Sequence, residues 1–219
     1  PFPREQHKRQ LDRFPPSVSN AGMIEIVMVV AGYLLGSVSA GVLVAHALGL
    51  GDPRNAGSGN PGATNVLRLG GKKAAALTLL GDGGKGMLAI WLAHQLDMAS
   101  GIIALTGLAA FIGHLYPVFH GFRGGKGVAT GFGVLLAWAW PAGLAALFTW
   151  LVVAAVGRRS SLAALAAAVL APVYLALLST PLMIIAAMTL MAVLTVYRHQ
   201  DNIRRLLDGT EPRIGRRRS

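Results

Sequence analysis

The chain has 219 residues, of which 53% are hydrophobic and only 13% are charged, and its mean hydropathy is +0.54. These values exclude an ordinary soluble domain, and the lack of cysteine excludes disulfides, thiolate metal sites and acyl-cysteine intermediates. The net charge of +11 comes from basic residues clustered at the ends of apolar runs, which favours anionic lipid headgroups and anionic substrates over nucleic acid.

Six apolar segments follow one another along the chain, at roughly 23–50, 74–94, 99–119, 128–157, 161–178 and 181–197. Most of them approach the roughly 20 residues that a membrane-spanning helix needs. The segment 128–157 is long for one such helix and short for two, and Pro141 lies near its middle, where a proline interrupts a helix. The number of spans therefore depends on whether the chain turns near Pro141.

The distribution of lysine and arginine decides this question. If 128–157 is a hairpin, every basic cluster after the first apolar segment lies on one side of the membrane, and the short loops on the other side contain no Lys or Arg. We therefore predict an all-α integral membrane protein with seven transmembrane helices, the N-terminus outside and the C-terminus cytoplasmic. The fourth helix, of about a dozen residues or about 18 Å, must be short, tilted or partly sheltered.

The two ends of the chain lie outside this predicted bundle. We divide the chain into a basic N-terminal arm (1–22), a seven-helix membrane domain (23–200) and a basic cytoplasmic tail (201–219). The basic residues of the arm argue against an outer N-terminus, but the basic loops carry more weight. The chain begins with Pro instead of Met, so we leave open whether the arm is native.

Polar residues collect in three segments on the predicted cytoplasmic face, namely GSGNPGATN at 57–65, FRGGKGVAT at 122–130 and YRHQDNIRRL at 197–206. Adjacent glycines let backbone N–H groups approach an anion without a Cβ in between, and a helix that starts just after them adds the positive end of its dipole. Such an arrangement binds phosphate. Lys126 and Arg68 would neutralise the phosphate charge, and arginine can bond two oxygens at once.

The same residues also have a structural interpretation. Glycines in membrane helices often only permit close packing, yet GGKG occurs twice, at 83–86 and 124–127, and each copy carries a lysine that packing does not require. Asp82 and Lys85 lie at the start of an apolar segment, where charge is costly, and they are either functional or a structural ion pair. Neither copy is a Walker A loop, because glycine follows the lysine.

Three long stretches together resemble the bacterial acyl-phosphate-dependent glycerol-3-phosphate acyltransferases, the PlsY family: GSGNPGATNVLRLGGKKAA, GHLYPVFHGFRGGKGVATGFG and YRHQDNIRRLLDGTEP. The resemblance begins near residue 23 and covers nearly all of the chain after it. It implies a multi-pass enzyme of the bacterial inner membrane, with the active site facing the cytoplasm. In phospholipid biosynthesis, such an enzyme moves a fatty acyl group from acyl phosphate to the 1-hydroxyl of glycerol 3-phosphate, giving lysophosphatidic acid and phosphate.

By motif position, the resemblance implies two groups of substrate-binding residues. The ligands of the glycerol-phosphate and of the reacting phosphates are Ser58, Arg68, Lys126, His199 and Asn202. The residues that shape the loops are Asn60, Gly62, Thr64, Asn65, Gly124, Gly125 and Gly127. Lys126 and His199 are assigned as catalytic. Where many relatives have a second serine after the fifth span, this chain has Ala164, and Ser161 is only a weak addition to the site.

The implied reaction needs little nucleophilic machinery, because acyl phosphate is already an activated mixed anhydride. The enzyme has mainly to hold two anions side by side and to stabilise the departing phosphate. The expected partners are glycerol 3-phosphate, acyl phosphate and membrane lipid, with no nucleic acid, no cofactor and no metal ion. His199 is either a general base or a phosphate ligand, and a substrate phosphate could remove the proton instead.

A transporter or an anion-binding membrane module is the alternative function. A transporter would concentrate polar groups near the bilayer midplane on interrupted helices, whereas here they gather at one interface. Among acyltransferases, the HxxxxD signature of another family occurs only as HKRQLD at 7–12, in the arm on the wrong face, where chance explains it. We therefore expect acyl phosphate, and not a thioester such as acyl-CoA, to be the acyl donor.

Overall fold

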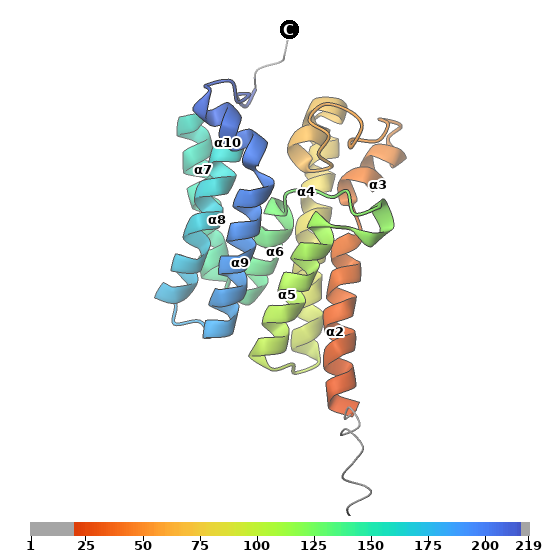
Figure 1. Cartoon of the computed structure of the whole chain (residues 1–219), viewed down its shortest axis with the longest axis vertical. Helices are drawn as coiled ribbons and strands as arrows, with labels where there is room; N and C mark the ends of the chain where they lie inside the picture. Colours follow the sequence, from red (N-terminus) through yellow and green to blue (C-terminus); the bar gives the residue numbers. More distant parts are fainter. Residues whose placement is uncertain (1–19, 216–219) are drawn as a thin grey trace, which may run out of the picture.

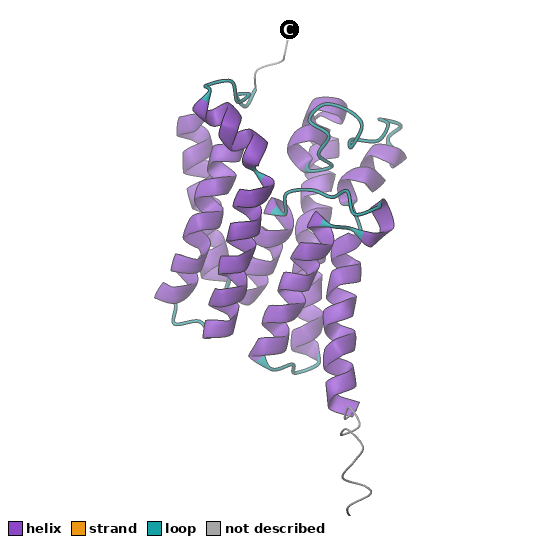
Figure 2. Cartoon of the chain, in the orientation of Figure 1, coloured by secondary structure: helices purple, strands orange, loops and turns teal. Residues whose placement is uncertain are grey.

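The computed structural model describes residues 20–215, and this part of the chain is helical without a strand (Figure 2). The helices, labelled as in Figure 1, are α2 (Asn20–Ser37), α3 (Ala40–Ala47), α4 (Ala63–Gln95), α5 (Ser100–Leu115), the 3-10 helix η1 (Val118–His120), α6 (Val128–Trp138), α7 (Trp140–Gly157), α8 (Ser160–Leu177), α9 (Leu182–Arg198) and α10 (Gln200–Leu207). The fold class predicted from composition is thus confirmed as all-α. The predicted arm (1–22) lies almost entirely outside the described residues, as do the last four residues of the tail.

The helices form one bundle of two groups, with α2 to α5 in one and α7 to α9 in the other (Figure 1). Helix α6 packs against α4 and α7, and α5 packs against α9, so these contacts join the groups. The α3–α4 loop, the α5–α6 loop and α10 lie toward one end, which we call the polar end. The α4–α5 and α8–α9 loops and the start of α2 lie at the other end (Figure 1).

Several helices are long and apolar enough to cross a membrane. Four described segments meet this condition, namely Gly22–Ala47, Ser100–His120, Trp140–Gly157 and Ser160–Leu177. A fifth results if α9 and α10, which are bent by 60° at His199, count as one broken span. Helix α4 is not among these segments, and α6 is an apolar helix too short to meet the same condition. The structure therefore supports a multi-pass membrane protein by composition and length.

The chain breaks inside the segment 128–157, as the position of Pro141 predicts. Ala139 is extended, with φ −156° and ψ 95°, and it separates α6 from α7, in which Pro141 occupies the first turn. Proline fits there because the first turn of a helix has no use for its missing N–H. Helix α6 has 11 residues, which corresponds to about 16 Å, and it is sheltered by neighbouring helices.

Two element boundaries differ from the sequence-based expectation. The first apolar segment is not one helix, because it breaks after Ser37 and resumes at Ala40. Helix α4 begins at Ala63 instead of near residue 74, with a kink at Gly71, where φ is +77°. Lysine and arginine are good helix formers, so the polar stretch before the apolar run continues as helix, and a glycine allows the bend.

The first GGKG copy, at 83–86, lies in the middle of α4 and is used for packing. A Cβ on Gly133 of α6 would lie 1.9 Å from the carbonyl oxygen of Gly83, and a Cβ on Gly86 would lie 2.5 Å from the carbonyl oxygen of Thr130. The backbones of α4 and α6 therefore approach more closely than any larger residue allows. For the glycines of this copy, the structural interpretation is right.

Candidate functional site

The second GGKG copy meets three other segments at the polar end of the bundle. The ammonium of Lys126 donates to Oδ1 of Asn202 at the start of α10. Nδ2 of Asn202 donates to Oε1 of Glu211 at 2.7 Å, and the hydroxyl of Ser161 in the first turn of α8 donates to the same oxygen at 2.6 Å. We call Lys126, Ser161, Asn202 and Glu211 the polar cluster. It joins residues that are far apart in the sequence.

Glu211 is the centre of this cluster, and it is a buried carboxylate. Burial raises its pKa, but hydrogen bonds from Ser161, Asn202 and Arg205 lower it by more, so its pKa lies below the ordinary value. Nε of Arg205 donates to Oε2 at 2.7 Å and balances the charge. The carboxylate therefore stays ionised at neutral pH and orients the amide of Asn202, whose oxygen then faces Lys126.

Lys126 is the cation of the site, and it is partly buried. Burial lowers its pKa to about 8, and the positive charge of Arg205 adds to this effect. The next residue, Gly127, has φ +82° and caps the N-terminus of α6. A Cβ there would lie 2.2 Å from the ring of Phe111, so both its backbone conformation and its surroundings require glycine. Lys126 thus stands at the positive end of the α6 dipole, where an anion is favoured.

His199 lies at the bend between α9 and α10 and is buried. Its Nδ1 is 2.7 Å from the carbonyl oxygen of Thr195. Because a carbonyl only accepts, Nδ1 carries the proton of the neutral ring and Nε2 carries the lone pair. Burial lowers the pKa of His199 to about 4, so the imidazole is neutral at physiological pH. In this state His199 is able to accept a proton at Nε2.

The loop that carries Lys126 is held in place by Arg198. The guanidinium of Arg198 donates from Nε to the carbonyl of Gly125 at 3.2 Å and from an Nη to that of Gly124 at 3.0 Å. It also lies over the ring of Tyr116, 5.5 Å from its centroid. The carbonyl oxygens of Gly124 and Gly125 thus accept hydrogen bonds from Arg198, and these bonds fix the backbone that carries Lys126.

The first loop, GSGNPGATN, is folded by its two asparagines. The side chain of Asn65, only 2% exposed, accepts the N–H of Ser58 at 3.0 Å and donates to the carbonyls of Pro53 and Ala56 at 3.0 and 2.9 Å. Oδ1 of Asn60 accepts the N–H of Gly62 at 3.0 Å, just before α4 begins. These amides therefore have partners within the loop.

The other residues expected in this loop remain exposed to solvent. Ser58, Thr64 and Arg68 are exposed, and none of them forms a hydrogen bond or ion pair with the polar cluster in the described part of the chain. The loops are nevertheless tied together, because Arg54 pairs with Asp52 at 2.6 Å and donates to the carbonyl of His120 at 2.9 Å. The structure thus joins Lys126 and Asn202 directly and places His199 where the charge of Lys126 acts on it, and the role of Arg68 stays a prediction.

The comparison with known proteins follows the same residues. The family model for glycerol-3-phosphate acyltransferase matches residues 26–209, which include the three polar segments and helices α3 to α10. The chain belongs to the glycerol-3-phosphate acyltransferase family. The resemblance to the PlsY family seen in the three motifs is confirmed.

Relatives in this family match along most of their length. The glycerol-3-phosphate acyltransferase of Methylococcus capsulatus is 57% identical over 195 residues, which cover 89% of this chain and 98% of the relative. That of Ralstonia nicotianae is 58% identical over 194 residues, covering 87% and 94%. The chain therefore spans nearly the whole length of these family members.

Two solved structures share the fold. Both are crystal structures of PlsY, described as an integral membrane glycerol 3-phosphate acyltransferase. The glycerol 3-phosphate form superposes with a TM-score of 0.84 at 40% identity, covering 87% of this chain and 96% of that one. The lysophosphatidic acid form gives 0.82 at 38% identity, covering 87% and 95%. The fold described above is thus that of a known acyltransferase.

Some residues of this family site could not be found by counting charges. Glu211 stands in a mostly basic tail, and Arg198 is the neighbour of His199, so proximity to a motif was the only signal for either. Ser161 was taken as a weak addition, yet its hydroxyl belongs to the polar cluster. Residues Gly124, Gly125 and Gly127 form the loop around Lys126, as the motif predicts.

We predict that Lys126→Ala weakens the binding of inorganic phosphate at least tenfold. The variant loses a charge-assisted hydrogen bond, which is worth about 1.5–3 kcal/mol. Isothermal titration calorimetry on the purified protein measures the Kd, and a melting curve checks that the fold persists. Lys72→Ala, which removes an exposed lysine of α4, is the control and should leave the Kd unchanged. Equal losses in both variants would mean that overall charge, and no defined site, binds the anion.

The pH dependence of phosphate affinity tests the same role of Lys126. Because the pKa of Lys126 is about 8, its charge is present below this pH and is lost as the pH rises through it. Phosphate affinity should therefore fall above pH about 8 in the wild type and persist in Lys126→Arg, whose guanidinium stays charged. The ratio of the two affinities at each pH cancels the ionisation of phosphate itself. A constant ratio from about pH 7 to about pH 9.5 would show that Lys126 does not titrate in this range.

Proposed function

We propose that this chain transfers a fatty acyl group from acyl phosphate to the 1-hydroxyl of glycerol 3-phosphate, which yields lysophosphatidic acid and phosphate. The observation that carries the proposal is the position of Lys126 at the N-terminus of α6, where it donates to Asn202 and where its neighbour Gly127 lines an apolar pocket. Support comes from the family and from the solved PlsY structures, which are described as glycerol 3-phosphate and lysophosphatidic acid forms.

The proposed reaction places charge where this site has positive groups. The 1-hydroxyl attacks the acyl carbonyl carbon, a new ester bond forms, and the bond between that carbon and the phosphate oxygen breaks. Lys126 and the N–H groups that open α6 stabilise the phosphate that leaves, because they are fixed before the reaction and partly shielded from water. The proton of the hydroxyl goes to Nε2 of His199 or to an oxygen of a bound phosphate.

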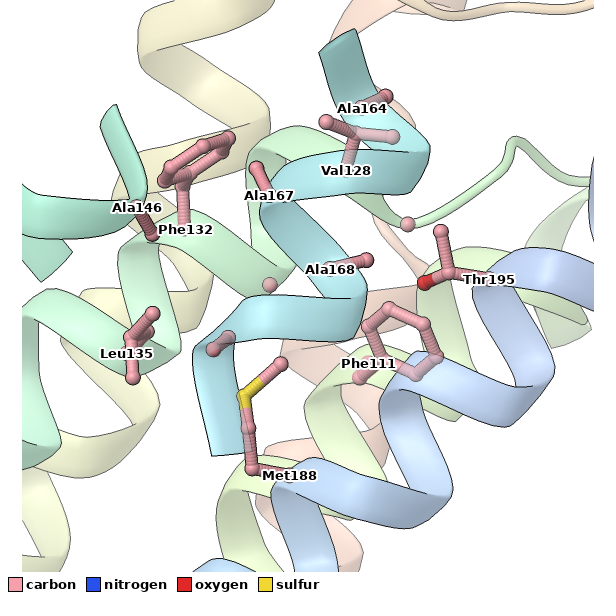
Figure 3. A pocket seen from close by; sticks show the side chains of 13 residues that line it. Phe111, Val128, Phe132, Leu135, Ala146, Ala164, Ala167, Ala168, Met188 and Thr195 are labelled. Atoms are coloured by element: carbon pink, nitrogen blue, oxygen red, sulfur yellow. The ribbon is translucent and has the colours of Figure 1, made fainter. Parts of the chain in front are cut away.

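An apolar pocket is the proposed site of the acyl chain next to its carbonyl group. Its walls come from α5, α6, α7, α8 and α9, and its lining includes Phe111, Leu135, Met188 and the alanines Ala146, Ala164, Ala167, Ala168 and Ala171 (Figure 3). Gly127 and Thr195 also line it, and they adjoin Lys126 and His199 respectively. The small side chains of α8 leave the room. An acyl chain in this pocket would have its carbonyl end beside Lys126.

The topology belongs to the same proposal. Helices α4 and α6, together with α2–α3, α5, α7, α8 and α9, make seven spans that put the polar end in the cytoplasm. Support comes from the basic loops and from the opposite ends at which α2 begins and α10 lies (Figure 1). In a bacterium this membrane is the inner membrane, where the site would face the pool of water-soluble glycerol 3-phosphate.

The acyl donor is tested directly. With purified protein and glycerol 3-phosphate, palmitoyl phosphate should support lysophosphatidic acid formation, and palmitoyl-CoA should support less than one hundredth of that rate. The site stabilises a departing phosphate but has nothing matched to a thiolate, and the chain has no cysteine to carry the acyl group. Product is followed by mass spectrometry. Comparable kcat/KM values for the two donors, with the acyl-CoA activity surviving Lys126→Ala, would overturn the proposal.

We predict that Ala168→Leu shortens the acyl chain that the enzyme accepts. A leucine at this half-buried wall of the pocket fills space that a long chain needs. The ratio of kcat/KM for a 16-carbon to that for an 8-carbon acyl phosphate should fall at least fivefold. Ala166→Leu, on the same helix with similar burial but outside the pocket lining, is the matched control. An equal shift in both variants, or none in either, would place the chain elsewhere.

The topology is tested with single cysteines, because the chain has none of its own. Ala99→Cys and Thr180→Cys lie in the loops opposite the polar end, and Arg123→Cys and Arg213→Cys lie at the polar end. A membrane-impermeant maleimide added to intact spheroplasts should label only the first two. All four should react after lysis. Labelling of Arg123→Cys in intact spheroplasts would reverse the proposed orientation.

A further inference from the structure

A second group of ionisable side chains lies away from the polar cluster, inside the bundle. Asp82 and Lys85 of α4 and His114 of α5 are only 1%, 8% and 6% exposed. The ammonium of Lys85 is 2.9 Å from Oδ1 of Asp82, and Nδ1 of His114 is 3.5 Å from the same oxygen. We call these three residues the buried triad. Charges in such a place are costly and are retained only with partners or for a function.

The triad holds the break between α2 and α3. The helix stops after Ser37 and resumes at Ala40, which leaves backbone groups without their usual helical partners. Lys85 donates to the carbonyl of Val38 at 2.6 Å, and Oδ1 of Asp82 accepts the N–H of Ala40 at 3.3 Å. Both charged residues of α4 thus satisfy the groups that the break exposes, and they set where α3 begins.

Helix α3 in turn positions the first loop. A Cβ on Gly41 would lie 1.7 Å from the carbonyl oxygen of Pro61, so the backbones of α3 and of the GSGNPG segment are in direct contact. No side chain lies between them to absorb a shift. If α3 moves, Pro61 and the start of α4 must move with it.

The third member of the triad contacts the second loop. The N–H of Gly125 donates to the carbonyl of His114 at 3.1 Å. A Cβ on Gly125 would lie 2.2 Å from Nε2 of His114, so the imidazole packs directly against this glycine of GGKG. The ring that faces Asp82 with Nδ1 therefore faces the Lys126 loop with Nε2.

We propose that the buried triad is a positioning device, which fixes the two phosphate-binding loops relative to each other. Asp82 is its common member, because it contacts Lys85, His114 and the start of α3 at once. One loop depends on it through α3, and the other through His114. Its members act through the loops and touch no reacting atom. This inference rests on the proposed function of the loops in binding two phosphates.

The test separates positioning from stability with a double variant. Asp82→Asn and Lys85→Met each leave a buried charge without its partner and should lower the Tm. Asp82→Asn combined with Lys85→Met removes both charges, so its Tm should return to within a few degrees of the wild type. The KM for glycerol 3-phosphate should nevertheless stay at least tenfold above the wild-type value, because a thioether in place of the ammonium cannot donate to the Val38 carbonyl. Recovery of Tm and KM together would show a merely structural ion pair.

A second variant tests the other branch and does not depend on the folding of the first. In His114→Asn the amide replaces Nδ1 toward Asp82, and the ring is withdrawn from Gly125. Its KM for glycerol 3-phosphate should rise at least threefold with a smaller change in kcat. An unchanged KM would overturn the contact between His114 and the GGKG loop as a determinant of binding.

A matched control excludes a general effect of polar groups inside α4. Thr78 lies one turn before Asp82, and its buried hydroxyl donates to the carbonyl of Ala74 in its own helix. Thr78→Val removes this hydroxyl. Its KM should equal that of the wild type, and a rise like that of the double variant would overturn the proposal. The Kd for glycerol 3-phosphate is measured in parallel by calorimetry. If the wild type binds glycerol 3-phosphate but transfers no acyl group, the proposed function fails while the affinities still test the positioning.

Discussion

The arrangement of the polar end depends on the hydrogen bonds that the buried carboxylate of Glu211 accepts. This carboxylate accepts hydrogen bonds from Ser161 of α8, Asn202 of α10 and Arg205, and through Asn202 it reaches Lys126 before α6. A carboxylate with a single partner would be too costly to bury. With three donors, it holds together the start of α8, α10 and the segment after α10. The Glu211 carboxylate therefore sets the position of the Lys126 ammonium through the amide of Asn202.

The two GGKG copies show that the same four residues serve different purposes according to their position in a helix. In the middle of α4, the glycines bring backbones together and Lys85 is drawn into the buried triad. Before α6, the glycines form a loop and Lys126 donates to Asn202 in the polar cluster. What separates them is whether the backbone N–H groups are already used by a helix. Only the copy at a helix start has N–H groups to offer to a ligand.

Much of the fold could be predicted from the sequence, because membrane helices follow from apolar length and from the side on which basic residues lie. The break near Pro141 is an example, since proline and charge both indicated it. The break at Val38 could not be predicted, because its backbone partners, Asp82 and Lys85, lie more than 40 residues away. The early start of α4 could not be predicted from hydropathy, because hydropathy does not distinguish a polar helix from a loop.

The same distinction applies to the site. Lys126, His199 and Asn202 stand in motifs whose composition suits phosphate; the fold joins Lys126 to Asn202 by a hydrogen bond and places His199 within the electrostatic influence of Lys126. Arg198 donates hydrogen bonds to two loop carbonyls, and Glu211 orients the amide of Asn202. Both roles depend on the positions of atoms in the fold, which the composition of a motif does not reveal. Asn65 was expected to shape its loop, and it does so with three hydrogen bonds that no motif specifies.

The shortness of α6 has a consequence for where the proposed acyl transfer would take place. Because α6 rises only about 16 Å, its first turn lies well below the level that α7 and α8 reach at the polar end (Figure 1). In the proposed reaction, the reacting groups would therefore meet below that level, beside Lys126. Glycerol 3-phosphate would have to reach this depth from water, while an acyl chain in the apolar pocket would already lie among the helices. The lysophosphatidic acid formed in this way would lie with its head group toward the polar end and its acyl chain among apolar side chains, so lateral diffusion would suffice for it to join the leaflet.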